Sequence, residues 1–245
     1  MRPILLAASI GLLCTISGVV AARADQCVVP PAPNALWALA QCCMRSLAND
    51  VGCRVYDKAD DYIILKDNAV RKPRSYMIIP TIRVTGIEDR LVARPPTVDF
   101  WQYGWAQSRT YPGYPMADTG LAINSQHGRT ENQLHIHISC VRPDVKQALD
   151  HAAIELFPAQ PVTLRLPPHD HLYRAVKVSS LAGKQSPFLV FQTDRQVKDD
   201  MGRQSIAVVG SRVANEYFVL DTSRGDGNPG VAEELLDQTC MGVPR

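Results

Sequence analysis

The sequence predicts an α+β protein in which an antiparallel sheet is flanked by helices. Two short β-rich runs, residues 62–66 and 75–80, are separated by a turn-like segment, and together they favour an antiparallel hairpin. Apolar residues recur with helical spacing over residues 35–47. Pro143 is a residue typical of a first helical position. Past Pro158 further short strands follow, so we expect an extended C-terminal half that is also α+β, with no visible sequence repeat.

The remaining expected elements follow from the same periodicities. In chain order they are a helix at 98–108, strands at 121–124 and 134–140, a helix from 143 to about 156, strands at 162–166, 172–178, 188–191, 205–209 and 217–220, and a helix at 231–238. We expect residues 25–245 to form one unit, or two sub-domains that share a core.

The N-terminus is typical of an exported protein. Arg2 precedes an apolar run over residues 4–20, which ends at Ala22-Arg23-Ala24. This order predicts that residues 1–24 are a secretory signal peptide or an uncleaved signal anchor, and both imply export. Six cysteines remain after this segment, and an even number in an exported chain favours disulfide bonds.

The charge of the chain indicates no polyelectrolyte partner. Its 26 Lys and Arg residues against 24 Asp and Glu residues leave a formal net charge of +2. No basic run is interleaved with aromatic residues, so the sequence does not support nucleic-acid binding.

The chemistry is concentrated in residues 124–140. In an extended strand, successive side chains point to opposite faces, so His135, His137 and Ser139 share one face. The opposite face carries apolar residues, which are Leu134, Ile136, Ile138 and Cys140. This alternation predicts a half-buried strand with one reactive face.

His137 is the residue expected to attack phosphorus. An imidazole can do so when its other nitrogen is held by an acceptor that fixes the tautomer. The preceding loop offers backbone amides around Gly128 and the side chains of Arg129, Thr130 and Asn132, all suited to stabilising charge on a phosphate.

The same segment resembles the histidine-triad superfamily. The residues that carry the resemblance are Leu-His-Ile-His-Ile-Ser, the preceding Asn124, and the turn Gly128-Arg129-Thr130. The stretch 121–144 is more closely similar to the CDP-diacylglycerol pyrophosphatase family, with Ala-Ile-Asn-Ser, Gly-Arg-Thr-Glu-Asn and His-Ile-His-Ile-Ser-Cys-Val-Arg-Pro-Asp in order. Residues 62–66, 76–80, 83–89 and 237–240 extend the resemblance over most of the exported chain.

The resemblance implies a histidine-triad-like sheet and a CDP-diacylglycerol diphosphatase of phospholipid metabolism. The expected reaction hydrolyses CDP-diacylglycerol to CMP and phosphatidate through a covalent nucleotidyl intermediate on His137, with no cofactor and no metal. The expected location is the periplasmic face of the inner membrane, where the partners are the lipid-linked nucleotide and the membrane surface.

Further residues take roles by position in the family pattern. His135 is expected to shape the site, Asn124 to orient His137 or the nucleotide, and Asn132 to contact phosphate. Ser139 stands where the superfamily often has a third histidine, and Lys66 is a candidate for stabilising charge. For the cysteines, we expect Cys140 to bond to Cys240 and Cys53 to bond to Cys42 or Cys43, while Cys27 takes the remaining thiol or stays free.

Several alternatives compete with this interpretation. His135 and His137 are compatible with an ordinary hydrogen-bonded strand pair, or with a zinc pair completed by His127 or His151. A two-histidine phosphoesterase is excluded because the pair His169-Asp-His171 lacks the necessary Ser or Thr. The alternative functions are an exported nucleotide- or lipid-binding module, and a hydrolase or transferase acting on another nucleoside diphosphate ester. The oligomeric state is open.

Overall fold

The structure is a computed structural model that describes residues 27–47, 52–158, 160–192, 200–225 and 227–243. The strands are β1 (Cys53–Asp57), β2 (Tyr62–Lys66), β3 (Tyr76–Pro80), β4 (Thr119–Ile123), β5 (Ile136–Val141), β6 (Val162–Leu166), β7 (His171–Val178), β8 (Gln204–Gly210), β9 (Tyr217–Ser223) and β10 (Leu236–Asp237). The α-helices are α1 (Ala35–Arg45), α2 (Phe100–Ser108), α3 (Pro143–His151) and α4 (Pro187–Val190). The 3-10 helices are η1 (Arg90–Ala93), η2 (Thr97–Asp99), η3 (Met116–Asp118), η4 (Gly183–Gln185), η5 (Met201–Arg203) and η6 (Ala232–Leu235).

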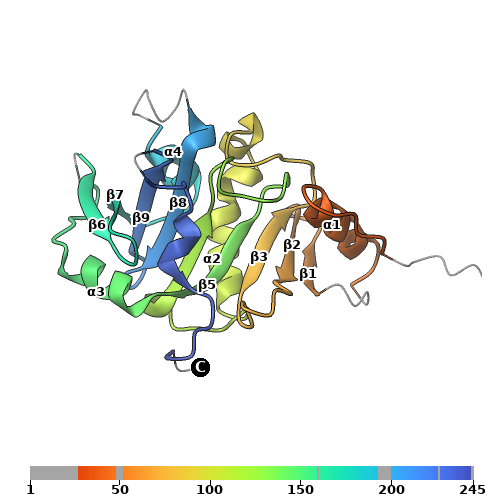
Figure 1. The fold of residues 1–245 in the computed structure, drawn as a ribbon, viewed down its shortest axis with the longest axis horizontal. Helices are drawn as coiled ribbons and strands as arrows, with labels where there is room; N and C mark the ends of the chain where they lie inside the picture. The colour runs from red at the N-terminus through yellow and green to blue at the C-terminus, as the bar shows by residue number, and fades with distance from the viewer. Residues whose placement is uncertain (1–26, 48–51, 159, 193–199, 226, 244–245) are drawn as a thin grey trace, which may run out of the picture.

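The strands form one sheet that spans the molecule (Figure 1). It has ten strands in the order β1-β2-β3-β5-β4-β8-β9-β7-β6, with β10 added beside β5. Every one of these strand pairs is antiparallel. The predicted α+β class, the antiparallel sheet and the first hairpin are therefore confirmed.

The strand order contains a repeat that the sequence does not reveal. The first half of the sheet runs β2-β3-β5-β4, and the second half, taken from its own edge, runs β6-β7-β9-β8. In each half a helix stands between the second and third strands along the chain, α2 in the first and α4 in the second. The halves meet where β4 pairs with β8, with Ala122 opposite Ala207. The protein thus builds both halves of a continuous sheet from a single chain.

The crossover helices α2 and α4 cover the same face of the sheet. Trp101 of α2 and Phe188 of α4 lie with ring centroids 5.4 Å apart, above Ile138 and Val208. Gly104 allows α2 to approach the strands closely, because a Cβ there would lie 3.1 Å from Ile78. Each fully buried large apolar side chain contributes about 1.5–3 kcal/mol, so this layer is a main source of stability.

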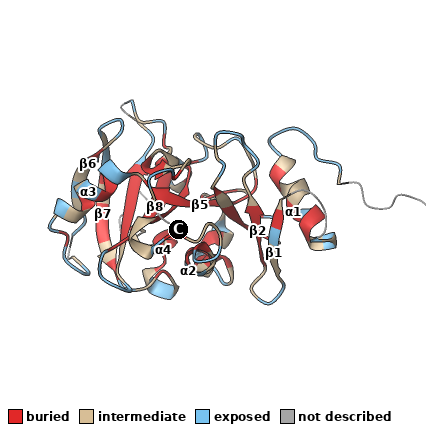
Figure 2. Ribbon diagram, turned by 90° about the horizontal axis from the view of Figure 1, so that it is seen from below, coloured by how far each residue is buried: buried red, intermediate tan, exposed pale blue. Residues whose placement is uncertain are grey.

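The opposite face is covered by α3 and η6. Val145 and Leu149 of α3, with Leu235 of η6, pack on Ala207 and Leu220 of the sheet. Figure 2 shows that burial is concentrated in the strands and that the loops carry most of the exposed residues. This second face also bears His137, so η6 and its neighbours decide what surrounds the imidazole.

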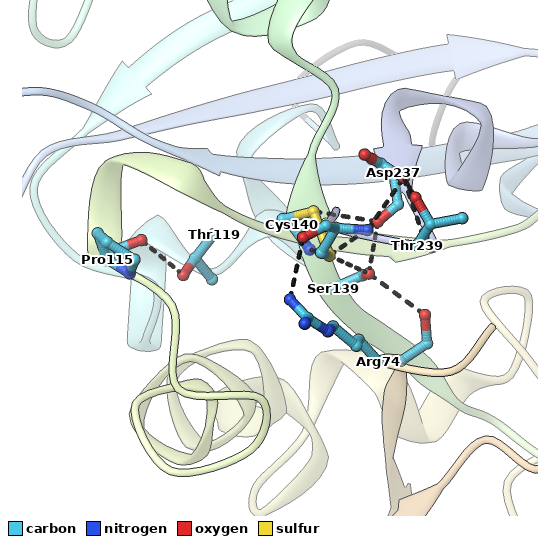
Figure 3. The surroundings of a disulfide bond; sticks show 9 residues. Arg74, Pro115, Thr119, Ser139, Cys140, Asp237 and Thr239 are labelled. Atoms are coloured by element: carbon cyan, nitrogen blue, oxygen red, sulfur yellow. Dashed lines mark hydrogen bonds between the residues drawn. A yellow bond between two sulfur atoms is a disulfide. The ribbon is translucent and has the colours of Figure 1, made fainter. Parts of the chain in front are cut away.

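Three disulfide bonds join the six cysteines that follow the predicted signal segment. They link Cys27 to Cys42, Cys43 to Cys53, and Cys140 to Cys240. The expected Cys140–Cys240 bond and the Cys43 alternative for Cys53 are both confirmed, and Cys27 takes the remaining thiol. The third bond fastens β5 to the C-terminal segment across 100 residues (Figure 3).

Two expected elements were wrong. Residues 188–190 of the segment 188–191, predicted as a strand, belong to the helical turn α4, because Pro187 at its first position starts a helix and a single turn is too short to show an amphipathic period. Residues 231–238, predicted as a helix, form η6 and then β10, because Leu236 and Asp237 pair with β5 and Cys240 is bonded there. In addition, β1 was missed, and α3 ends at His151, earlier than predicted.

The predicted signal segment, residues 1–24, lies outside the described residues. In the ranges that the structure does describe, no helix is both long and apolar enough to cross a bilayer.

Candidate active site

His137 lies near the middle of the sheet, on the face opposite α2. It pairs with Met77 of β3 and Ala122 of β4, so two apolar strands flank it. Its neighbours Ile136 and Ile138 point into the core beneath α2, in agreement with the predicted alternation.

The imidazole of His137 is nearly enclosed, and its side chain is 7% exposed. Its Nε2 lies 3.3 Å from Oε2 of Glu233, whereas its Nδ1 is buried and has no hydrogen-bond partner among the described residues. Burial lowers the pKa of His137 below its ordinary value, and Lys72 adds to this effect while Glu233 opposes it. A neutral imidazole is the form that carries a nucleophilic lone pair.

Glu233 of η6 is the centre of a polar network that the sequence analysis missed. Its carboxylate accepts hydrogen bonds from Nζ of Lys72, Nε2 of Gln238 and Nδ2 of Asn124, the last at 3.1 Å. Its backbone N–H donates to Oδ1 of Asn124 at 3.1 Å. Asn124 thus holds both the backbone and the side chain of Glu233, and it reaches His137 through that carboxylate.

Glu233 is ionised at neutral pH. Burial raises its pKa, but the interaction with His137, the charge of Lys72 and the hydrogen bonds from Lys72 and Gln238 outweigh this, and the pKa falls to about 2. Because His137 is neutral at neutral pH, Lys72 supplies the charge that keeps the carboxylate ionised. Lys72 also lies 3.6 Å from Asp67.

His135 stands just before β5, with its ring against that of His137. The two ring centroids are 4.9 Å apart and the planes are near perpendicular. Nδ1 of His135 lies 2.7 Å from the carbonyl oxygen of Gln133, which can only accept, so Nδ1 carries the proton. Burial lowers the pKa of His135 to about 3, so this ring is also neutral. His135 therefore packs beside His137 as a neutral ring whose orientation is fixed by its hydrogen bond to Gln133.

Ser139 shares the face of His137 but is tied to the disulfide region (Figure 3). Its Oγ donates to the carbonyl oxygen of Asp237 at 3.0 Å and accepts from Oγ of Ser75 at 3.2 Å. Oγ also lies 3.4 Å from Sγ of Cys240. These contacts link the strand of His137 to the segment that contains Gln238.

The charged group of the predicted phosphate loop is engaged by other side chains. Arg129 forms a two-pronged ion pair with Glu88 at 2.7 and 2.6 Å, and it also donates to Oδ1 of Asn132 at 3.4 Å. Thr130 is exposed. The charge of Arg129 nevertheless contributes to the lowered pKa of His135.

Lys66 supports the site indirectly. Its Nζ donates to the carbonyl oxygens of Asp67, Lys72 and Ser75 at 2.7, 3.1 and 3.1 Å. It therefore closes the loop between β2 and β3, and this loop carries Lys72 to Glu233. Burial lowers the pKa of Lys66.

The predicted disulfide was the sequence signal that could have located the missing residues. A bond between Cys140 and Cys240 brings the residues just before Cys240 against β5, and Glu233 and Gln238 are in that segment. Among the described residues, no group of three or more His, Cys, Asp and Glu side chains is arranged to hold a metal ion.

Comparisons with solved structures give distant likenesses of fold. A DUF4931 family protein from Bacillus cereus ATCC 10987 is 13% identical, with 72% of this chain and 88% of that chain covered and a TM-score of 0.47. Yeast Ap4A phosphorylase Apa2 in complex with AMP is 10% identical, with 69% of this chain and 58% of that chain covered and a TM-score of 0.44.

The comparison with family models is decisive. The model described as CDP-diacylglycerol pyrophosphatase matches residues 31–243, which is nearly all of the part that follows the predicted signal. The resemblance stated from the motifs and the expected enzyme class, a hydrolase acting on phosphoric anhydrides, are thereby confirmed. The chain belongs to the CDP-diacylglycerol pyrophosphatase family.

Proposed function

We propose that this protein hydrolyses the pyrophosphate bond of CDP-diacylglycerol to CMP and phosphatidate through a covalent nucleotidyl intermediate on His137. The observation that carries the proposal is the setting of this imidazole. It is neutral and nearly enclosed, and hydrogen-bond donors from Lys72, Asn124 and Gln238 gather beside its Nε2. Such donors stabilise negative charge on a phosphate during attack.

The reaction proceeds in two displacements at the cytidylyl phosphorus. In the first, an imidazole lone pair of His137 forms a P–N bond, the P–O bond to phosphatidate breaks, and phosphatidate leaves with the electron pair. In the second, water attacks the same phosphorus, the P–N bond breaks and its electron pair returns to the imidazole. One proton of the water stays on the oxygen added to CMP, and the other passes to solvent. A phosphate leaving group needs little acid assistance, so no third histidine at Ser139 is required.

The neighbouring residues divide the supporting work. His135 fixes the position of the His137 ring, and Asn124 orients Glu233, which contacts His137. We propose that Thr130 and Asn132 contact the nucleotide or phosphate from the loop, as the family resemblance implies. Arg129 and Lys66 hold loops in place, because their charged groups are already engaged by Glu88 and by backbone carbonyls.

The proposed place of action is the periplasmic face of the inner membrane. Three disulfide bonds are in keeping with an oxidising compartment. Both the substrate and the phosphatidate product are lipids, so the enzyme must work at a membrane surface. Activity is therefore expected to depend on presenting CDP-diacylglycerol in vesicles or mixed micelles.

The first test is release of CMP from CDP-diacylglycerol by the wild type and by His137→Ala, with and without a chelator. We expect chelator-resistant release that falls by at least ~10³-fold in the variant, because removal of a nucleophile costs about that or more. Mass spectrometry of acid-quenched and alkali-quenched enzyme should detect a cytidylyl group that is labile to acid on His137. A folded wild type that binds substrate but releases no CMP would favour the binding module, and release only with an added alcohol would favour a transferase.

A further inference from the structure

Glu233 occupies a place in the site that the proposed reaction needs for phosphate. Its carboxylate is the acceptor for Lys72, Gln238 and Asn124, and it lies 3.3 Å from Nε2 of His137. An anion that receives three side-chain hydrogen bonds and contacts an imidazole nitrogen is held as a bound phosphate oxygen would be. A substrate phosphorus cannot approach Nε2 while this carboxylate remains there.

Exposure indicates from which side a ligand enters. Nδ1 of His137 is buried, so no substrate reaches that nitrogen directly. The side chains of Lys72 and Glu233, in contrast, are 25% and 12% exposed. The Nε2 side of the imidazole is thus the side nearer to solvent, and the Glu233 carboxylate lies between Nε2 and solvent.

The carboxylate also sets the tautomer of the free protein. An ionised acceptor 3.3 Å from Nε2 favours a proton on that nitrogen, which removes the lone pair needed for attack. Attack requires the other tautomer, in which water has taken the proton from Nε2 and supplied one to Nδ1. That tautomer becomes favourable only when the carboxylate turns away and Nε2 loses its acceptor, and the Nε2 lone pair is then directed at the vacated position. The backbone N–H of Glu233 stays bonded to Asn124, so rotation of the side chain suffices for the exchange.

We propose that Lys72, Gln238 and Asn124 form an anion cradle for the substrate phosphate under attack, and that the Glu233 carboxylate fills this cradle in the free enzyme and is displaced by the phosphate. The inference rests on the proposed reaction at His137 and adds the subsite in which the phosphate is held. It assigns phosphate-binding roles to Lys72 and Gln238 and a competing role to Glu233.

The test measures binding rather than turnover, with inorganic phosphate and CMP as probes in calorimetric titrations of the full exported chain. We expect Glu233→Gln to bind phosphate at least ~10-fold more tightly than the wild type, because a neutral amide does not compete as an anion. Lys72→Gln should bind it at least ~10-fold more weakly, and Gln238→Ala should show a smaller loss in the same direction. The exposed residues Lys58 and Glu155 give matched controls, and Lys58→Gln and Glu155→Gln should bind phosphate as the wild type does.

A second readout separates displacement from a purely structural effect. In the wild type, phosphate should move the ¹⁵N resonance of Nε2 in His137 as the acceptor changes, and in Glu233→Gln that resonance should differ before phosphate is added. Unchanged phosphate affinity in both Glu233→Gln and Lys72→Gln would overturn the cradle, even if the wild type releases CMP. Loss of CMP release in Glu233→Gln without a gain in phosphate affinity would also overturn it, and would make Glu233 a positioning residue for His137. Failure of the proposed function is a different result, in which phosphate binds as expected but His137→Ala still releases CMP.

Discussion

The two four-stranded halves of the sheet place different side chains at matching positions of one face. A row of paired residues crosses the whole sheet on the His137 face: Cys53, Leu65, Met77, His137, Ala122, Ala207, Leu220, Ala175 and Val162. His137 and Leu220 stand at equal distances from the central pair Ala122 and Ala207. In the first half this position carries the imidazole, and in the second half it is fully buried leucine.

The difference shows how the same framework serves as a core in one half and as the proposed reactive site in the other. Leu220 packs under α3 with Tyr173 and Phe218 in an apolar layer, and the Tyr173 hydroxyl donates to Glu234. At His137, the covering element η6 brings Glu233 in place of an apolar side chain. Nδ1 of His137 is buried without a hydrogen-bond partner among the described residues, which costs about 1–3 kcal/mol, whereas the second half has a buried leucine at this position.

The largest expected effect separates the two positions directly. His137→Gln should reduce CMP release by at least ~10³-fold and leave the free energy of unfolding within about 1 kcal/mol of the wild type, since an amide retains a polar contact with Glu233. Leu220→Ala should lower the free energy of unfolding by about 2–5 kcal/mol and leave CMP release per folded molecule within about threefold. The measurements are turnover and urea denaturation on both variants. Loss of turnover in folded Leu220→Ala would mean that the second half takes part in catalysis.

The sequence predicted the strand that contains His137, but it did not predict that Glu233 and Lys72 lie beside it. Alternation over residues 134–140 predicted the face of His137, because a strand's side chains follow a local two-residue period. Glu233 is 96 positions further along the chain, so no local period connects it to His137. Lys72 was hidden for a similar reason, because it lies in a loop whose path is set by the three carbonyl contacts of Lys66.

The repeat in the sheet was invisible for a related reason. His137 and Leu220 share a place in the fold but no chemistry, and the turn α4 is much shorter than its counterpart α2. The two halves have the same strand order because their strands pair through backbone hydrogen bonds, which do not depend on side-chain identity. The order of the strands in the sheet shows that the halves correspond, and the pairing of β4 with β8 joins them.

The next expected effect concerns the disulfide that only the first half possesses. Replacing both Cys140 and Cys240 with serine should lower the free energy of unfolding by about 3–5 kcal/mol, because the bond closes a loop of 100 residues. It should also weaken CMP release, since the bond holds the segment with Gln238 against β5. The double variant of Cys43 and Cys53, which removes a loop of only 10 residues, should lose about 2 kcal/mol less. Equal turnover in the two double variants would show that the C-terminal segment holds its place without the bond.

A smaller effect is expected at Arg129, which the motif pointed to as a phosphate contact. Arg129→Ala leaves Glu88 without its partner in a partly buried pair, so we expect the free energy of unfolding to fall by about 3 kcal/mol. The KM for CDP-diacylglycerol should change by less than about threefold if the guanidinium serves the loop alone. Arg165, in an exposed pair with Asp170, provides the control, and Arg165→Ala should cost no more than about 1 kcal/mol. A large rise in KM with little loss of stability would restore the phosphate-binding role of Arg129.

The smallest effect is a pH dependence of stability that arises from the two buried histidines of the site half. The pKa of His135 is about 3 in the folded protein, well below the ordinary histidine value of about 6.5. Between these values the unfolded chain binds a proton that the folded chain does not, so the stabilising contribution is full above about pH 6.5 and is lost as pH falls. Each such proton changes the free energy of unfolding by up to about 1.4 kcal/mol per pH unit. The pKa of His137 is also lowered and acts in the same direction, whereas the carboxylate of Glu233 contributes only as pH falls from about 4.5 towards 2.

Urea denaturation between pH 6.5 and 5 therefore isolates the histidines from Glu233. The wild type should lose stability over this interval, and His135→Asn should show a shallower slope, by up to about 1.4 kcal/mol per pH unit. His151 is exposed, so His151→Asn should keep the wild-type slope. If His135→Asn has the same slope as the wild type, His135 is protonated in the folded protein over this pH interval. The site would then contain a positive charge beside His137 in addition to that of Lys72.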